Sequence, residues 1–599
     1  MLLGVASAPE RRNTQEYFAS LRARCYCDAA SWDRTAMKLP DRPNSGQTTF
    51  ETLVSEFRWE IPDRFNIGRA VADAWAMVDP GRICLQHFQA DGHHLSMTYG
   101  ELKEQSDRLA NGLISLGIAR GDRVALLLPQ GFDVVIAHVA IYKIGAIALP
   151  LALLFGNEAI SYRLADSGAA AIITNAFGLS KLSGSDGEYP GLRHVILTEG
   201  PAAGTVGFQA LIQAHPPAFA CVETTPDDPA LMIYTSGTTG PPKGALHGHR
   251  VLAGHIPGLQ LAHEFFPQEG DRFWTPSDWA WAGGLLNCLL PSLMLGVPVV
   301  SSPSQKFDAA LAWRIIAEMG VRNAFIPPTA LRLMASVEDP MVAYPNHLRT
   351  IGSAGETLGR QTYEWARAAL GITVNEFYGQ TECNFVLGSS AGLGVSRAGA
   401  IGKALPGHVV AIIDDKGREV PAGTIGQIAV RRPDPVMFLG YWNNPEATRA
   451  KFIGDFMLTG DQGVADAEGY FTFFGRDDDV ITSSGYRIGP AEIEDCLVGH
   501  PAVRLAAVIG KPDALRTEIV KAFVVLKDGF APSPELSAGI SDWVKTRLSM
   551  HEYPREVEFV DALPMTTTGK IMRRILRNRE TSAQATMSGQ IRFSGPPAP

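Results

Sequence analysis

The chain has 599 residues, of which 46% are hydrophobic and 19% charged, and its formal net charge is −9. This length excludes a single hydrophobic core, and the acidic charge without a long basic run argues against a nucleic-acid partner. The seven cysteines are scattered along the chain. An odd number of cysteines in a large chain predicts reduced thiols and a cytoplasmic location.

The first half of the chain predicts alternating helices and strands. Residues 1–50 have no sustained hydrophobic period, so we expect a loosely ordered extension, with regular structure beginning near residue 57. Hydrophobic spacing predicts helices over 67–77, 98–117 and 133–145, and strands over 123–128, 146–150, 170–174, 194–197 and 230–233. This alternation predicts parallel sheets with helices on their faces. The apolar run 134–155 contains Lys143 and Pro150, so we interpret it as core and expect no membrane span.

The same alternation resumes in the middle of the chain. The expected strands are 297–300, 323–326, 350–352 and 373–377, and the expected helices are 308–319 and 359–370. Ligands bind beyond the carboxyl ends of the strands in such sheets. The loops in which we expect functional residues are therefore 275–284, 327–329, 353–356 and 378–382.

The last third of the chain predicts a different pattern of secondary structure. Short strands with Gly, Pro and Asp turns predict a small β-rich subdomain over about 400–475. A charged turn at 476–479 marks the expected domain boundary. We therefore predict an N-terminal domain over 51–477, a C-terminal domain over 478–578 and a disordered tail over 579–599.

Residues 234–244 carry the strongest local signal for chemistry. They read Tyr-Thr-Ser-Gly-Thr-Thr-Gly-Pro-Pro-Lys-Gly and directly follow a predicted buried strand. Glycines let backbone N–H groups turn toward an anion, hydroxyls add donors, and Lys243 adds a positive charge. We interpret the segment as a polyphosphate-binding loop, with a flexible surface loop as the alternative. It is not the P-loop of ordinary NTPases, because no hydroxyl residue follows the lysine.

Four further motifs follow this loop in the chain. They are 378–382 (Tyr-Gly-Gln-Thr-Glu), 459–461 (Thr-Gly-Asp), the segment from Phe-Gly-Arg-Asp-Asp at 474–478 through Gly-Tyr-Arg at 485–487 to Glu-Ile-Glu at 492–494, and 564–570 (Pro-Met-Thr-Thr-Thr-Gly-Lys). With all five in this order, the chain resembles the acyl-adenylate-forming enzymes, which include acyl-CoA synthetases, adenylation domains of peptide synthetases and luciferases. The resemblance implies an α/β fold with two parallel-sheet subdomains and a small β-barrel-like subdomain in the N-terminal domain. It also implies a smaller, mobile α+β C-terminal domain.

The resemblance also implies the reaction, which proceeds in two half-reactions. A small-molecule carboxylic acid attacks the α-phosphate of ATP, giving an acyl-adenylate and pyrophosphate, and the thiol of coenzyme A then displaces AMP. Because the first step joins two anions, Mg²⁺ and positive side chains are expected to offset their repulsion. A general base is not expected, since a carboxylic acid is already ionised at pH 7. The expected oligomeric state is a monomer or a homodimer.

Individual roles follow by position from the resemblance. The residues implied to contact ATP or AMP are Thr235, Ser236, Gly237, Thr238, Thr239, Gly240, Lys243, Ser353, Gly355, Glu356, Tyr378, Gly379, Gln380, Thr381, Asp461, Arg476, Arg487 and Lys570. Glu382 is implied to bind Mg²⁺ with the hydroxyl of Thr238, and Lys570 is the implied catalytic lysine beside these two. Asp478 is implied as the hinge, and Ser484 and Gly485 as the part that approaches coenzyme A.

The identity of the acid depends on weaker signals. The acetyl-CoA synthetase branch has a tryptophan where this chain has Gly379, so we expect a pocket that admits an acid larger than acetate. The candidate lining residues are Trp279, Trp281, Gly283, Ile326, Ala354 and Gly379, and either tryptophan could instead be a core residue. The segments 57–62 and 274–284 look most like medium-chain acyl-CoA synthetases. We expect a medium-chain fatty acid, with an aromatic or branched acid as the alternative.

Two other classes of function remain open. One is an adenylate-forming module that loads a carrier protein, although no carrier domain is evident after residue 578. The other is an inactive protein that keeps the fold as a scaffold. The presence of Lys570, Asp461 and Glu382 argues against the scaffold.

Overall fold

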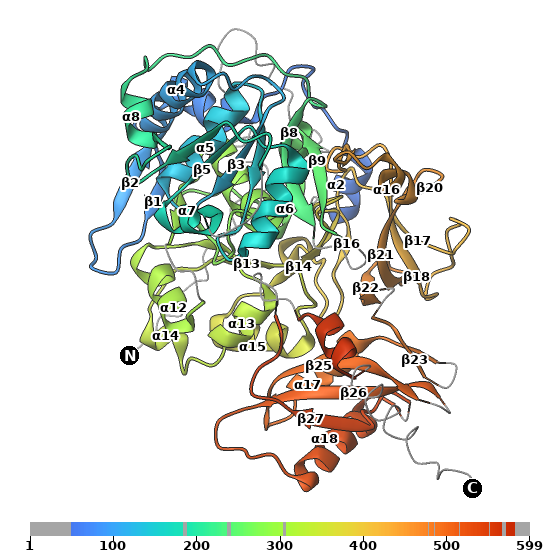
Figure 1. Ribbon diagram of the computed structural model, residues 1–599. Coiled ribbons are helices and arrows are strands. Elements are labelled where there is room, and N and C mark those ends of the chain that lie inside the picture. Colours follow the sequence, from blue (N-terminus) through green and yellow to red (C-terminus); the bar gives the residue numbers. More distant parts are fainter. Residues whose placement is uncertain are drawn as a thin grey trace, which may run out of the picture.

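The computed structural model describes residues 49–183, 189–235, 241–302, 307–476, 479–483, 486–513, 516–549, 551–565 and 571–580. The predicted N-terminal extension, apart from its last two residues, and the tail from 581 onward lie outside this range. Figure 1 shows a large body formed by the chain up to about residue 476 and a smaller body formed by the remainder. Among the described residues, no helix is long and apolar enough to cross a membrane. The five described cysteines are free thiols.

The first layer of the large body is an eight-stranded sheet in the order β19-β9-β8-β4-β3-β5-β6-β7. Its strands are β3 (Arg123–Leu127), β4 (Ile147–Pro150), β5 (Ala171–Thr174), β6 (His194–Leu197), β7 (Val206–Gly207), β8 (Pro229–Thr235), β9 (Lys243–Gly248) and β19 (Gly440–Tyr441). The strands from β8 through β4 to β7 are parallel, while β9 and β19 run antiparallel to their neighbours. The polyphosphate loop therefore connects two adjacent strands.

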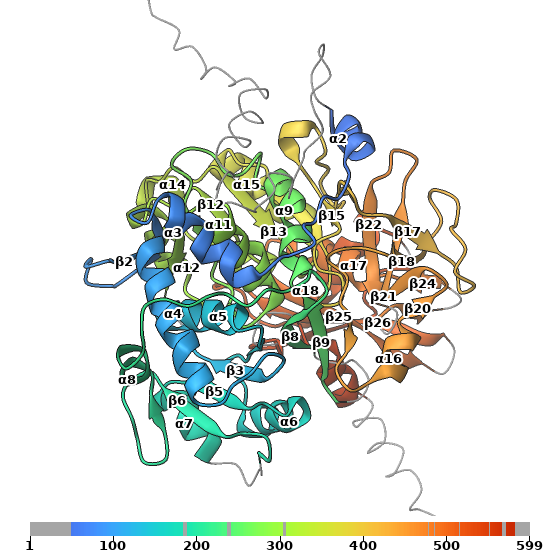
Figure 2. The same cartoon turned by 90° about the horizontal axis from the view of Figure 1, so that it is seen from above.

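Helices cover both faces of this sheet. They are α4 (Tyr99–Ser115), α5 (Phe132–Lys143), α6 (Asn157–Ser167), α7 (Ala176–Ser183), α8 (Phe208–Gln213) and α9 (Arg250–Ala262). Figure 2 shows α4 and α5 on one side of β3 and β5, and α6 and α7 on the other. The alternation along β3 explains this, because Val124 and Leu126 pack into one hydrophobic cluster while Ala125 and Leu127 pack into another.

The second layer is a nine-stranded sheet in the order β16-β15-β14-β13-β12-β10-β11-β1-β2. Its strands are β1 (Ile83–His87), β2 (Leu95–Thr98), β10 (Phe273–Trp274), β11 (Val299–Ser301), β12 (Asn323–Phe325), β13 (Thr350–Ser353), β14 (Asn375–Tyr378), β15 (Leu387–Gly388) and β16 (Lys403–Ala404). The helical segments of this part are η1 (Arg69–Asp73), α3 (Ala74–Val78), α10 (Ala282–Gly284), η2 (Leu285–Leu289), α11 (Leu290–Met294), α12 (Ala309–Glu318), α13 (Pro328–Met334), α14 (Pro340–Ala343), α15 (Arg360–Leu370) and η3 (Ala391–Leu393). The central strands from β1 to β14 are parallel, so the loops after β12, β13 and β14 lie at one edge.

A third sheet of five strands completes the large body. It consists of β17 (Val410–Ile413), β18 (Gly426–Arg431), β20 (Phe452–Ile453), β21 (Phe456–Ala465) and β22 (Phe471–Arg476), with α16 (Pro445–Ala450) between β19 and β20. All of its strand pairs are antiparallel. Because β22 is the last of these strands, this sheet leads the chain directly into the small body.

The small body has its own sheet and its own hydrophobic clusters. Its elements are β23 (Ile481–Ser483), β24 (Tyr486–Ile488), α17 (Pro490–Val498), β25 (Val503–Asp513), β26 (Thr517–Leu526), α18 (Pro534–Arg547) and β27 (Glu556–Phe559). Residues 573–580 are also helical. Figure 1 shows this last helical segment, in red, on the side of the small body that faces the large one.

The predicted α/β fold class is confirmed, and most predicted strands and helices form within a few residues of the expected bounds. Regular structure begins earlier than predicted, with α2 (Phe50–Glu56), because Thr49 caps the helix and Phe50 and Leu53 are buried. The predicted loop 327–329 contains the first residues of α13, whose first position is Pro328. The domain boundaries remain predictions.

Candidate active site

The polyphosphate loop is the connection between β8 and β9, whose ends pair at Thr235 and Lys243. The Thr235 hydroxyl lies 3.4 Å from the carbonyl oxygen of Lys243. At the end of the loop, the Pro242 carbonyl accepts a hydrogen bond of 3.0 Å from the Tyr162 hydroxyl. Ser236, Gly237, Thr238, Thr239 and Gly240 lie outside the described residues. The described flanks thus form a fixed base for a short loop.

A contact through Tyr441 brings Glu382 close to this base. The Tyr441 hydroxyl donates a hydrogen bond of 2.5 Å to Glu382 Oε1, and the Lys243 ammonium lies 5.3 Å from the centre of the Tyr441 ring. Glu382 is 7% exposed. Pairing of β19 with β9 fixes Tyr441 opposite Ala245. A loop lysine and a buried carboxylate that are far apart in the sequence therefore meet at one place.

Asp461 lies at the centre of a second polar group. Its carboxylate accepts hydrogen bonds from the Tyr378 hydroxyl at 2.5 Å and from Gln380 Nε2 at 2.6 Å, and its other oxygen lies 3.4 Å from the Arg476 guanidinium. Asp461 and Arg476 are direct partners on β21 and β22. Burial raises the pKa of Asp461, despite the opposing effects of Arg476 and the two hydrogen bonds. Three of the five sequence motifs thus contribute to one cluster, and Thr381 lies in the turn that follows Gln380.

The loop after β13 is held to the loop after β12 by hydrogen bonds. The Ser353 hydroxyl donates to the Ile326 carbonyl at 2.8 Å, and Gly355 adopts a φ of 98°, which favours glycine. Glu356 accepts a hydrogen bond of 2.7 Å from the Thr329 hydroxyl. These contacts join the loops after β12 and β13, as predicted for ligand-binding loops at one edge of a parallel sheet.

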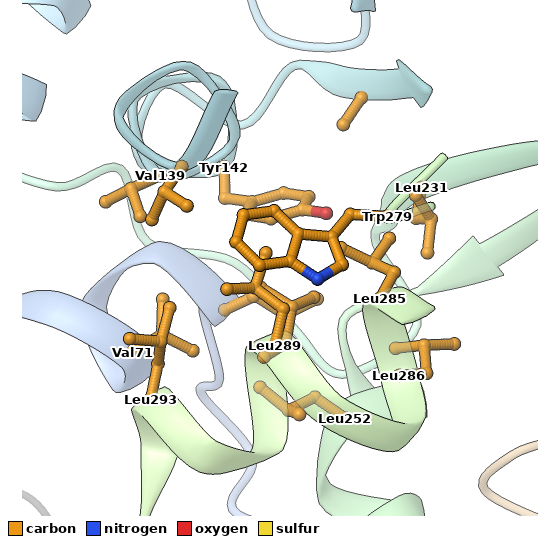
Figure 3. Close-up of a cluster of buried hydrophobic side chains, with 14 of the residues drawn as sticks. Val71, Val139, Tyr142, Leu231, Leu252, Trp279, Leu285, Leu286, Leu289 and Leu293 are labelled. Atoms are coloured by element: carbon orange, nitrogen blue, oxygen red, sulfur yellow. The ribbon is translucent and has the colours of Figure 1, made fainter. Parts of the chain in front are cut away.

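The two candidate tryptophans of the acid pocket have different environments. Trp279 is 1% exposed and packs among side chains from several elements, including Val139, Tyr142 and Leu289 (Figure 3). This environment favours the alternative that Trp279 is a core residue, and its place in the acid pocket stays a prediction. Trp281 is only half-buried, and its ring meets the edge of Phe155 at a centroid distance of 5.5 Å.

Among the other pocket candidates, Gly283 faces a side chain. A Cβ built at Gly283 would lie 3.1 Å from the Phe325 ring. Ile326 is fully buried in a separate hydrophobic cluster, and Ala354 is 8% exposed. At Gly283, a side chain and not the backbone therefore limits the space for an added Cβ.

The backbone around Gly379 indicates a second reason for this glycine. A Cβ at this position would lie 1.0 Å from the Asn384 carbonyl oxygen. Asn384 has a φ of 46°, and its N–H donates to the Gln380 carbonyl at 2.6 Å. The space beyond Gly379 is thus filled by the backbone of its own loop, and the glycine is required by this close approach. Its presence alone does not enlarge the acid pocket.

The structure also identifies polar residues that the sequence motifs did not indicate. Glu376 on β14 is buried, and burial raises its pKa to about 8, while the Leu358 N–H donates to its Oε1 at 3.0 Å. Neither Glu376 nor Tyr441 belongs to a motif that the sequence analysis used. The only available signal for Tyr441 is its place in a Gly-Tyr-Trp run, which by itself is uninformative.

On the small body, Arg573 interacts with several acidic side chains. Its guanidinium donates to Glu494 at 2.6 Å and lies 3.4 Å from Asp479. Although burial opposes it, the pKa of Arg573 is raised by Glu494, Asp479 and Glu356, and the last of these belongs to the large body. Lys570, Asp478, Ser484 and Gly485 lie outside the described residues, and Arg487 lies on β24 with only its backbone described.

Among the described residues, no three His, Cys, Asp or Glu side chains converge as a metal cluster. A Mg²⁺ ion that bridges a nucleotide needs less than that, because it commonly uses one or two carboxylates together with phosphate oxygens and water. Glu382 fits this requirement, since its carboxylate is oriented by Tyr441 and lies beside the base of the loop. The cation that this carboxylate would hold, together with the nearby Lys243 ammonium, would offset the negative charge of a polyphosphate.

Comparisons with known proteins agree with this geometry. The sequence profile of the AMP-binding enzymes matches residues 72–442, and that of the AMP-binding enzyme C-terminal domain matches residues 492–570. The mitochondrial acyl-coenzyme A synthetase ACSM2 of Rattus norvegicus is 36% identical over 534 residues, which cover 87% of this chain and 92% of that protein. The anthranilate CoA ligase AuaEII, solved with anthranoyl-AMP, superposes with a TM-score of 0.82 at 29% identity over 88% of this chain and 99% of that one. An acyl-CoA synthetase of Brucella canis superposes with a TM-score of 0.70 at 35% identity, covering 90% of this chain and 100% of that one. The predicted resemblance is thus confirmed, and the chain belongs to the family of AMP-binding enzymes.

Proposed function

We propose that this protein is an AMP-forming acyl-CoA ligase. It converts a carboxylic acid, ATP and coenzyme A into an acyl-CoA, AMP and pyrophosphate through an acyl-adenylate. The observation that carries this proposal is the contact of Tyr441 with both Glu382 and Lys243, because it joins a magnesium-type ligand to the base of a polyphosphate loop. A reducing compartment such as the cytoplasm suits the free thiols.

The large domain binds the nucleotide. The loop from Thr235 to Lys243, with Thr238, holds the β- and γ-phosphates, and Glu382 holds Mg²⁺, which supplies positive charge to the polyphosphate when bound. Asp461 and Arg476 hold the ribose hydroxyls. In this role Asp461 exchanges the hydrogen bonds it accepts from Tyr378 and Gln380 for bonds from the ribose. A carboxylate accepts such bonds well because charge-assisted hydrogen bonds are the stronger ones.

The small domain supplies the groups that differ between the two half-reactions. Lys570 stabilises the negative charge that develops between the carboxylate and the α-phosphate, and Arg487 contacts the phosphates. After adenylation, rotation about Asp478 withdraws Lys570 and brings Ser484 and Gly485 toward the thiol. The electrostatic interaction of Arg573 with Glu356 supports the first arrangement, since Arg573 follows Lys570 by three residues.

For the acid we propose a medium-chain fatty acid. The support comes from the relatives named as ACSM synthetases, which match at 36% identity over most of the chain. An aromatic acid is the second candidate, favoured by the fold similarity to an anthranilate CoA ligase and to a benzoate CoA ligase from Burkholderia xenovorans. Trp281 is the described aromatic candidate for contact with either acid.

The test is a pyrophosphate-release panel with acetate, butyrate, octanoate, palmitate and benzoate, with and without coenzyme A. We expect the highest kcat/KM with octanoate and acyl-CoA as the product when free coenzyme A is supplied. A maximum with benzoate would select the second candidate. Adenylate formation without acyl-CoA would indicate a carrier-loading enzyme, and no pyrophosphate release with any of the acids would refute the proposal.

A further inference from the structure

Helix α15 of the large domain begins without a capping side chain of its own. Its N-cap residue is Gly359, at a φ of 80°, and its first turn contains no acidic residue. The N–H groups of a first helical turn lack intrahelical partners and carry a partial positive charge. The local sequence thus leaves this helix end uncompensated, and it even adds a positive charge at Arg360.

The small domain supplies the missing cap. Asp495, on α17, accepts a hydrogen bond of 3.1 Å from the Arg360 N–H through Oδ2. A Cβ at Gly359 would lie 2.2 Å from the other oxygen, Oδ1. The carboxylate therefore occupies the space that a side chain at residue 359 would fill. This is the arrangement of a helix N-cap, with the capping group donated from another domain.

The capping contact stands at the edge of an open groove. The two domains also come close together at Gly499, where a Cβ would be 2.9 Å from Gln361 Nε2. Beyond these contacts, a groove of about 480 Å³ separates the domains, with Phe474 on one side and Trp543 on the other. Because this groove leaves part of the domain interface unpacked, the domains can separate without exposing a hydrophobic core. Single polar contacts therefore have a larger influence on which domain arrangement is favoured.

In this arrangement, the end of the small domain interacts with the loop after β13 of the large domain. Arg573 lies close enough to Glu356 for their charges to interact. Arg573 and Arg577 both bind Asp479, at 3.4 and 2.7 Å, which is the first described residue after the proposed hinge. The helical segment 573–580 thus connects the hinge side of the small domain with the nucleotide side of the large one.

We propose that Asp495 is a positioning residue that holds the small domain in the arrangement used for adenylation. It caps α15 across the domain boundary during the first half-reaction and releases this helix when the small domain rotates for thioester formation. The inference rests on the proposed function, because it requires two half-reactions with different domain arrangements. Asp495 touches neither the substrates nor the reacting atoms.

The first test compares the two half-reactions in Asp495→Ala and Asp495→Asn. Asp528→Asn, at an exposed position of the same domain, is the matched control. In Asp495→Ala we expect acid-dependent ATP–pyrophosphate exchange to fall about fivefold in kcat, the size of a lost N-cap contact. The rate of acyl-CoA formation from supplied acyl-adenylate should be unchanged or higher. Asp495→Asn keeps an acceptor oxygen and should lose less, and the control should match the parent.

Equal losses in both half-reactions, or no loss of exchange in Asp495→Ala, would overturn the proposal. Thermal unfolding of each variant separates a positioning effect from a folding defect. We expect the unfolding midpoints of the variants to equal that of the parent protein.

The second test does not depend on activity. In a Cys496→Ser background, Gln361→Cys and Gly499→Cys are joined by a short bifunctional thiol reagent, with each single cysteine variant as the control. We expect efficient cross-linking that preserves exchange and blocks thioester formation, and a rate of cross-linking about fivefold lower when Asp495→Ala is added. Failure to cross-link, or cross-linking that Asp495→Ala leaves unchanged, would refute the capping role. If no acid supported pyrophosphate release, the proposed function would fail while this cross-linking comparison still tested the cap.

Discussion

Replacing Gly379 by alanine separates two explanations of this glycine. If it only leaves a gap in the wall of the acid pocket, a methyl group should be tolerated and should disfavour long acids alone. In the structure, that methyl would lie 1.0 Å from the Asn384 carbonyl oxygen. An ordinary contact needs about 3 Å, so the backbone of the turn must move by roughly 2 Å, and forced displacements of this kind typically cost about 1–3 kcal/mol. Glu382 lies within the displaced turn, and a shift of about 1 Å in a catalytic group can cost about a hundredfold in rate.

The assay is pyrophosphate release by Gly379→Ala with butyrate, octanoate and palmitate at several Mg²⁺ concentrations. We expect a loss of about a hundredfold for all three acids, with a raised Mg²⁺ requirement. Gly283→Ala is the matched comparison, because its methyl would meet the Phe325 ring at 3.1 Å, and a side chain can turn aside. That variant should keep its Mg²⁺ dependence and change only its preference among acids. A Gly379→Ala enzyme that is selectively impaired with palmitate would refute the reasoning and restore the pocket-wall interpretation.

Four further substitutions test other parts of the protein. Tyr441→Phe removes the donor to the buried Glu382 carboxylate, so kcat/KM for MgATP should fall about 10- to 100-fold, and unchanged Mg²⁺ titrations would contradict this role. Lys570→Ala should abolish adenylation yet still convert supplied acyl-adenylate, whereas Gly485→Leu should do the reverse, which exchange and thioester assays distinguish. Glu376 has a pKa raised by burial from 4.5 to about 8. Between these values the folded protein holds a proton that the unfolded chain has released, so stability should fall as pH rises toward 8. Glu376→Gln should remove this pH-dependent fall in the melting temperature. An unaltered dependence of the melting temperature on pH would contradict the role of Glu376.

The sequence predicts those features that depend on local pattern. Strands such as β3 and helices such as α4 are recognisable because hydrophobic period and capping residues act over a few positions, as in the capping box formed by Thr98 and Glu101. The loop after β13 was also predictable, because parallel strands in alternation with helices leave their carboxyl ends at one edge. The motifs indicated which residues to expect near a nucleotide without indicating how they contact one another.

What the sequence did not predict depends on pairing between distant segments. Trp279 and Trp281 have the same side chain and nearly the same neighbours in sequence, yet one is core and the other half-buried. The difference arises because the turn into α10 directs Trp279 toward helix α5, where Tyr142 and Val139 lie (Figure 3). Hydrophobicity alone cannot separate a core position from a pocket wall, because both require apolar side chains. In the same way, the filled space beyond Gly379 follows from the conformation of Asn384, which no spacing encodes.

The short segment around Tyr441 explains how separate sheets form one site. Its strand, β19, pairs with β9 at the base of the polyphosphate loop, and the Phe438 N–H donates to the Glu382 carbonyl at 2.8 Å. The segment therefore binds the first sheet through backbone pairing and the 378–382 turn through a backbone bond and the Tyr441 hydroxyl. Because one segment holds both partners, the position of the 378–382 turn relative to the base of the loop is set mainly by backbone pairing. Binding of a Mg²⁺–nucleotide should for this reason require little rearrangement within the large domain, which leaves the movement in the cycle to the small domain and to contacts such as that of Asp495 with α15.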